Sequence, residues 1–104
     1  METIRILVSK ILADLCRDDL YACRIATLED EAKHYFADFV VIDPFPIKLL
    51  ERSGVLKDAR VAGIEALSAL ETGDDAAEAV CHFCTCATTM DRFDHPSAYY
   101  HLED

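Results

Sequence analysis

The stretch that decides the fold is ARVAGIEALSALET at residues 59–72, which carries two apolar stripes at helical spacing. One stripe consists of Val61, Ile64, Leu67 and Leu70, and the other consists of the alanines Ala62, Ala66 and Ala69. Asp58 stands before the stretch as an N-cap, and Gly73 follows it as the left-handed residue that ends a helix. Because only Glu65 and Ser68 separate the two stripes, we predict that this helix lies at the centre of the domain.

A second long helix is predicted directly after Gly73. Asp74 or Asp75 caps it, and Asp75 and Glu78 have the spacing of a capping box. The residues expected on its buried stripe are Ala76, Val80, Phe83, Ala87 and Met90. Pro96 ends any continuation, so the last residues, SAYYHLED, are expected to form a short polar-aromatic tail.

The beginning of the chain also has helical periodicity. A helix capped by Thr3 and closed near Asp18 and Asp19 is expected there. Its apolar positions are Ile4, Leu7, Val8, Ile11, Leu12 and Leu15. Asp18 and Asp19 also start a short second helix through Leu20, Tyr21 and Ile25. A turn or a brief extended piece is the alternative for residues 21–26.

Thr27 and Asp30 then have the spacing of a capping box and predict the start of another helix. Its apolar face comprises Leu28, Ala32, Tyr35, Phe36, Phe39 and Val40, and it is expected to end near Ile42. Asp43 and Pro44 indicate a cap followed by proline at the first helical position. A short helix through Ile47, Leu49 and Leu50, ended by Gly54, should follow.

These elements predict an all-α fold. Residues 40–42 are β-branched, but no second strand of comparable quality exists to pair with them. We expect a single compact bundle of about five helices, one domain over residues 1–104, with a short polar-aromatic tail at the C-terminus. The residues predicted for its core are Phe36, Phe39, Ile64, Leu67, Val80 and Phe83.

Composition excludes several classes of protein. The combination of 52% hydrophobic residues with a net charge of −10 excludes the disordered acidic class, and 104 residues suffice for one domain. No run of 18 apolar residues predicts a membrane span, and the first 15 residues lack the basic region of a secretory signal. The three glycines lie too far apart for a phosphate loop, and no G-x-S-x-G elbow is present.

The cysteines indicate a reducing compartment, and we expect a cytoplasmic protein. Five cysteines are an odd number, and Cys81, Cys84 and Cys86 fall within six positions, unlike a secreted disulfide scaffold. In a helix, Cys81 and Cys84 lie toward one flank, and His82 and Cys86 lie toward the opposite flank. Because one ion cannot collect all four, we predict no metal site and no cofactor. A metal- or redox-responsive helical protein that uses this cluster is the alternative.

Catalytic constellations are weak in this sequence. Four histidines, at positions 34, 82, 95 and 101, could approach a cysteine, but nothing supplies an oxyanion hole. The grouped carboxylates (18–19, 29–31 and 74–75) all fall at or beside predicted helix termini. There they act as caps and interact favourably with the helix dipole. We therefore expect that the protein is not an enzyme.

The distribution of charge along the chain has no such local explanation. Residues 1–60 hold 11 acidic and 9 basic residues, whereas residues 61–104 hold 9 acidic residues and a single basic one, Arg92. A charge of one sign concentrated in 44 residues indicates a partner of the opposite sign. The same segment contains aromatic and amphipathic side chains typical of interfaces, namely Phe93, His95, Tyr99, Tyr100 and His101.

These observations predict a small acidic, non-enzymatic inhibitor that blocks a basic, nucleic-acid-binding surface of a protein partner by mimicking nucleic acid. Phage inhibitors of bacterial defence systems, anti-CRISPR proteins among them, are an analogy of type and not of sequence. The residues expected to contact the partner are Asp74, Asp75, Glu78, Asp91, Phe93, Asp94, Tyr99, Tyr100, Glu103 and Asp104. We expect no direct contact with nucleic acid or membrane. A structural subunit that forms a homodimer through an apolar helix face is a further alternative.

Overall fold

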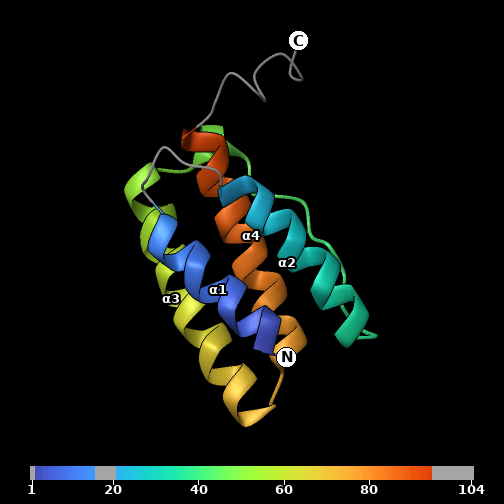
Figure 1. The fold of residues 1–104 in the computed structure, drawn as a ribbon. Coiled ribbons are helices and arrows are strands. Elements are labelled where there is room, and N and C mark those ends of the chain that lie inside the picture. The colour runs from blue at the N-terminus through green and yellow to red at the C-terminus, as the bar shows by residue number, and fades with distance from the viewer. Residues whose placement is uncertain (1, 16–20, 95–104) are drawn as a thin grey trace.

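The computed structural model describes residues 2–15 and 21–94 and is helical throughout its regular elements (Figure 1). The elements are α1 (Glu2–Asp14), α2 (Tyr21–Tyr35), the short 3-10 helix η1 (Ile47–Leu49), α3 (Arg52–Thr72) and α4 (Ala76–Asp94). Since these two ranges contain no strand, the all-α prediction is confirmed, with four α-helices in place of about five.

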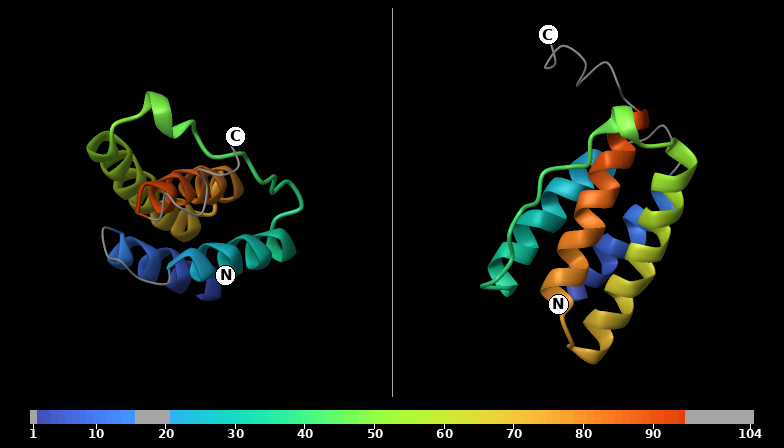
Figure 2. Two further views of the ribbon diagram at one scale, coloured as in Figure 1. Left: turned by 90° about the horizontal axis from the view of Figure 1, so that it is seen from above. Right: turned by 180° about the vertical axis from the view of Figure 1, so that it is seen from behind.

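The helices form two layers, with α1 and α2 in one and α3 and α4 in the other (Figure 2). An ion pair between Asp14 and Arg24 connects the end of α1 to the first turn of α2. Residues 36–51, which we call the strap, run from the end of α2 across α4 to the start of α3 (Figure 2). This arrangement places α4 against α2, α3 and the strap together.

The central helix is therefore α4, and the prediction of a central position for residues 59–72 is wrong. The stripe predicted for α4 is buried at all five positions, Ala76, Val80, Phe83, Ala87 and Met90. A second buried face carries Cys81, Thr85 and Thr89, which follow one another at intervals of four residues. The hydroxyls of Thr85 and Thr89 donate to the carbonyls of Cys81 and Thr85, at 3.1 and 2.9 Å. These bonds satisfy the polar groups that the strap covers.

Two hydrogen bonds connect the strap to this second face of α4. The Cys81 thiol donates to the Val40 carbonyl at 2.6 Å, and the Phe45 amide donates to the Thr89 hydroxyl at 3.2 Å. The predicted helix from Thr27 to Ile42 thus runs instead from Tyr21 to Tyr35, and the residues after it are non-helical up to η1. Two physical causes explain the difference. The β-branched run at 40–42 disfavours a helix, and the prolines at 44 and 46 push the residues before them toward extended backbone.

Four predicted caps lie inside helices. Thr3 is the second residue of α1, which begins at Glu2. Thr27 is in the middle of α2, where its hydroxyl donates to the carbonyl of Cys23 at 2.9 Å. Gly54 and Asp58 lie within α3, because that helix already begins at Arg52. The C-terminal signal at Gly73 is confirmed, since this residue has φ 81° and its amide donates to the carbonyl of Ala69.

The face that α3 turns inward is the alanine stripe. Ala59, Ala62, Gly63 and Ala66 are buried, whereas Ile64 is 64% exposed and Val61 is 47% exposed. The prediction of Ile64 as a core residue is therefore wrong. Small side chains let α3 approach α1 so closely that a Cβ at Gly63 would lie 2.6 Å from the Cγ of Leu12. Close approach of α1 and α3 thus decides the orientation of α3, and the larger side chains Val61 and Ile64 stay exposed as a consequence.

The remaining core predictions hold in full or in part. Val80 and Phe83 are completely buried, and Phe36, Phe39 and Leu67 are partly buried and pack against the core. On α1 the buried apolar residues are Ile4, Val8 and Ile11, with Leu15 directly after the helix. Among the described residues, no helix is both long enough and apolar enough to cross a bilayer.

Candidate partner-binding surface

Four exposed carboxylates lie where α3 ends and α4 begins, and we call them the acidic end: Glu71, Asp74, Asp75 and Glu78. The turn that presents them uses two residues with positive φ, Gly73 at 81° and Asp75 at 51°. Aspartate tolerates this backbone region better than most side chains, and the Asp74 amide donates to the Thr72 hydroxyl at 3.3 Å. The turn thus holds its carboxylates in water, away from the core.

A hollow of about 700 Å³ lies beside the acidic end, between the strap and the first turns of α4. Its apolar walls are Phe36, Val40, Ile42, Ala76 and Ala77. Its carboxylates come from three elements, since Asp38 is on the strap, Asp75 is in the turn and Glu78 is on α4. No lysine or arginine of the described part of the chain is among the lining residues. We call this cavity the acidic hollow.

A smaller hollow of about 390 Å³ lies between α3 and α4. It shares Asp75, Glu78 and His82 with the acidic hollow and adds Glu65 and Asp74. The exposed His82 therefore lies on the rim between two hollows that are both lined by carboxylates. Together they form one acidic surface with apolar walls.

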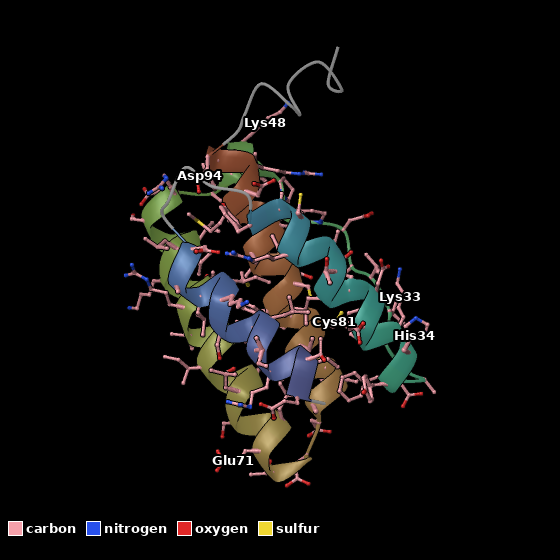
Figure 3. The ribbon with its side chains drawn as sticks, viewed as in Figure 1. Lys33, His34, Lys48, Glu71, Cys81 and Asp94 are labelled. Carbon is pink, nitrogen blue, oxygen red and sulfur yellow. The ribbon has the colours of Figure 1, made fainter. Side chains whose placement is uncertain are left out.

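The other described residues expected to contact a partner lie at the opposite end of α4, as Figure 3 shows for Asp94 relative to Glu71. At about 1.5 Å per residue, Glu78 and Asp91 are roughly 20 Å apart along this helix. Asp91 is buried, and Phe93 is partly buried and packs against the core. Asp91 is therefore not an exposed charge, although its expected contact with a partner requires exposure.

Asp94 instead connects three helices. Its carboxylate accepts a hydrogen bond from the hydroxyl of Tyr21 at 2.7 Å and another from the guanidinium of Arg52 at 2.8 Å. Only 9% of the Asp94 side chain is exposed. Burial, together with the bond to Asp94, raises the pKa of the Tyr21 hydroxyl, which therefore stays protonated as a donor.

The predicted contact residues thus separate into three sets. Asp74, Asp75 and Glu78 come together at the acidic end, while Asp91, Phe93 and Asp94 belong to the packing at the far end. Tyr99, Tyr100, Glu103 and Asp104 lie outside the described residues.

Sequence reasoning missed the strap side of the acidic hollow, Phe36, Asp38, Val40 and Ile42. The Asp-Pro-Phe-Pro run at 43–46 is the signal that could have indicated an extended segment there.

The three clustered cysteines of α4, Cys81, Cys84 and Cys86, are free thiols and are buried. Burial raises the pKa of all three thiols, to about 11 for Cys86, so that at neutral pH they are protonated. A reactive cysteine needs the opposite shift. His82 and Cys86 share one flank, with 3.8 Å between Nε2 and Sγ. Within residues 2–15 and 21–94, no three His, Cys, Asp or Glu side chains gather in a way that could hold a metal ion.

Cys81 differs from the other two cysteines, because its thiol donates to the strap and its side chain lines the acidic hollow. Figure 3 shows Cys81 about midway along the molecule. No protein-family model, curated protein or solved structure matches this chain.

Proposed function

We propose that this protein is a non-enzymatic binding protein whose acidic end docks on a basic surface of a protein partner. The observation that carries the proposal is the acidic hollow, in which apolar walls and three carboxylates lie together. Apolar walls contribute affinity by excluding water, and the surrounding carboxylates select a partner of positive charge. A surface of merely solvated acids would have no such walls.

The overall charge supports the same kind of partner. Residues 61–104 carry a net charge of −8, and the acidic end lies within this segment. Charges of one sign on an exposed surface act at a distance and raise the rate of encounter with a basic partner. Since nucleic-acid-binding grooves are the strongly basic surfaces of proteins, we propose an inhibitor that occupies such a groove, as nucleic-acid mimics do.

Capture of the partner from the cells that produce the protein tests this proposal. The immobilised protein should retain a partner at low salt, release it at high salt, and lose it to added duplex DNA or RNA. A triple variant, Asp74→Asn, Asp75→Asn and Glu78→Gln, should associate with that partner about tenfold more slowly, since rim charges act mainly on encounter.

The matched control removes the same charge elsewhere, through Asp30→Asn, Glu51→Gln and Asp58→Asn, all at exposed positions outside both hollows. It should lose much less of the association rate than the triple variant. A triple variant that binds as fast and as tightly as the parent would refute the proposed role of the acidic end.

A structural homodimer is a second candidate that one observation favours. Val61 and Ile64 form an exposed apolar pair on the outer face of α3. A dimer through this face would elute at twice the mass of the 11.6 kDa chain, and Ile64→Gln would return it to the monomer mass. Elution of the parent at the monomer mass would remove this candidate.

A further inference from the structure

The features of the acidic hollow indicate a more specific occupant than a basic surface of any kind. It combines a half-buried aromatic ring, Phe36, with carboxylates on the strap, the turn and α4. Its volume falls within the range of about 300–1,000 Å³ that is typical of sites for small ligands. It therefore has room for a whole side chain, with its stem along the apolar walls and its head among the carboxylates.

Charge decides which head group fits. The N-terminus of α4 opens toward the hollow at Ala76 and Ala77 and contributes roughly half a positive charge. Three carboxylates outweigh this contribution, so the hollow favours a cation. A guanidinium has five donors in a planar fork and stacks on aromatic rings, which suits acceptors on separate elements beside Phe36. An ammonium group has three donors and is more strongly hydrated.

We infer that the acidic hollow is a receptor for one arginine side chain of the basic partner. The inference rests on the proposed function and names the ligand chemistry of the same surface. The strap forms one wall of this receptor and is held there by the bond between Cys81 and the Val40 carbonyl. The arginine lies along Val40, Ile42 and Ala77, and its guanidinium reaches the carboxylates of Asp38 and Glu78.

An NMR titration of the labelled full chain with the blocked peptide Gly-Arg-Gly tests the receptor directly. The matched ligand is the same peptide with citrulline, which keeps the shape of arginine without its charge. The arginine peptide should shift the amide resonances of Asp38, Ala77 and His82 in a saturable way, and citrulline should bind at least tenfold more weakly. The corresponding lysine peptide should bind more weakly than arginine but more tightly than citrulline.

Variants of the protein locate the site. Ala77→Leu places a larger side chain in the hollow, and Asp38→Asn removes one carboxylate from the exposed strap. Each should weaken binding of the arginine peptide at least fivefold. The control, Glu71→Gln, removes the same charge at the acidic end but outside the hollow and should change binding less than twofold. Because Asp38 is exposed, its variant remains informative even if Ala77→Leu disturbs the first turn of α4.

Equal binding of the arginine and citrulline peptides would overturn the inference, as would shifts that map away from the hollow or parent-like affinity of Asp38→Asn. None of these results decides whether the acidic end binds a partner, which the triple variant tests separately. If the triple variant loses the captured partner while Ala77→Leu keeps it, the acidic end binds the partner without an arginine in the hollow. If the triple variant keeps the partner, the proposed function itself fails, whatever the peptide does.

Discussion

Asp94 is a single carboxylate on which the packing of three helices depends. It accepts hydrogen bonds from Tyr21 of α2 and Arg52 of α3 while it is largely shielded from water. A hydrogen bond to a charged group contributes about 1.5–3 kcal/mol, so Asp94→Asn should lower the free energy of unfolding by roughly that amount. Urea unfolding measures the loss, with the exposed Glu71→Gln as the control. If Asp94→Asn is as stable as the parent, this carboxylate does not support the fold.

Glu29, on α2, is a carboxylate that the fold partly removes from water. Burial raises its pKa above the ordinary 4.5, while Lys33 opposes and Asp30 adds to this shift. The folded chain therefore binds the proton more tightly than the unfolded chain does. Ionisation of Glu29 costs no stability well below its unfolded pKa, and the cost grows as the pH rises through the folded pKa.

Glu29→Gln should consequently raise the Tm at neutral pH, and the gain should shrink as the pH falls toward about 4. Thermal melts of parent and variant across this range measure the difference, and Asp30→Asn on the exposed side of the same helix is the control. A lower Tm for Glu29→Gln at neutral pH would mean that the ionised carboxylate is stabilised and not penalised by its surroundings.

At the scale of elements, substitutions of the two glycines of α3 distinguish the effect of helix propensity on stability from the effect of helix packing. A Cβ at Gly54 would meet nothing within 4 Å, whereas a Cβ at Gly63 would overlap Leu12 of α1. Gly54→Ala should therefore stabilise the protein by about 0.5–1 kcal/mol. Gly63→Ala gains the same propensity but must displace Leu12, and overpacking typically costs about 1–3 kcal/mol, so we expect a net loss of about 1 kcal/mol. Equal effects in chemical unfolding would contradict the close contact between α1 and α3.

The orientation of α3 relative to α4 has an equally direct test. Phe83 of α4 is completely buried, and its truncation to alanine should cost about 3–5 kcal/mol. Ile64 of α3 is mostly exposed, and Ile64→Ala should change stability by no more than about 0.5 kcal/mol. Denaturant midpoints of the two variants give both values. A loss below 1 kcal/mol for Phe83→Ala would mean that the register of α4 is wrong.

The buried stripes of α1 and α4 could be predicted from the sequence because each helix has a single stripe of apolar residues at helical spacing, so the orientation of that stripe follows from periodicity. The second buried face of α4, with Cys81, Thr85 and Thr89, is not apparent from this periodicity. α3 has two stripes, and local periodicity does not say which one faces the core. That choice depends on how closely Gly63 lets α1 approach, which is a tertiary property. The capping-box spacing of Thr27 and Asp30 misplaced α2, since packing of Tyr21 and Ile25 continues the helix toward its N-terminus.

The part of the candidate site that depends on local sequence was also predictable. Asp74, Asp75 and Glu78 follow from the count of charges and the turn at Gly73, both of which are local in the sequence. Asp38 and Phe36 belong to the same hollow only because the strap crosses α4, about forty residues away along the chain. The inclusion of Asp91 and Asp94 in the predicted contact surface was wrong, because both carboxylates are shielded from water by tertiary contacts. A count of charges along the sequence does not detect such contacts.

At the scale of the whole molecule, the charge predicts what the protein does not bind. A net charge of −10 opposes approach to a phosphate backbone, and residues 61–104 contain a single basic residue. Filter binding at low salt should therefore detect no association with single- or double-stranded DNA or RNA. Low-micromolar affinity for any of them would contradict a protein that competes with nucleic acid for its partner.

The central claim is that the acidic end faces a basic surface, and site-specific photo-crosslinking in the producing cells tests it most directly. A photoreactive phenylalanine analogue replaces the exposed Asp74, and a second protein carries it at the exposed Ser9 of α1 as the control. We predict a crosslink from position 74 to a peptide rich in lysine and arginine on a nucleic-acid-binding protein. This crosslink should be much weaker in the double variant Asp75→Asn, Glu78→Gln, and it should not form from position 9. The same partner crosslinked equally from both positions, or through an acidic peptide, would contradict the account.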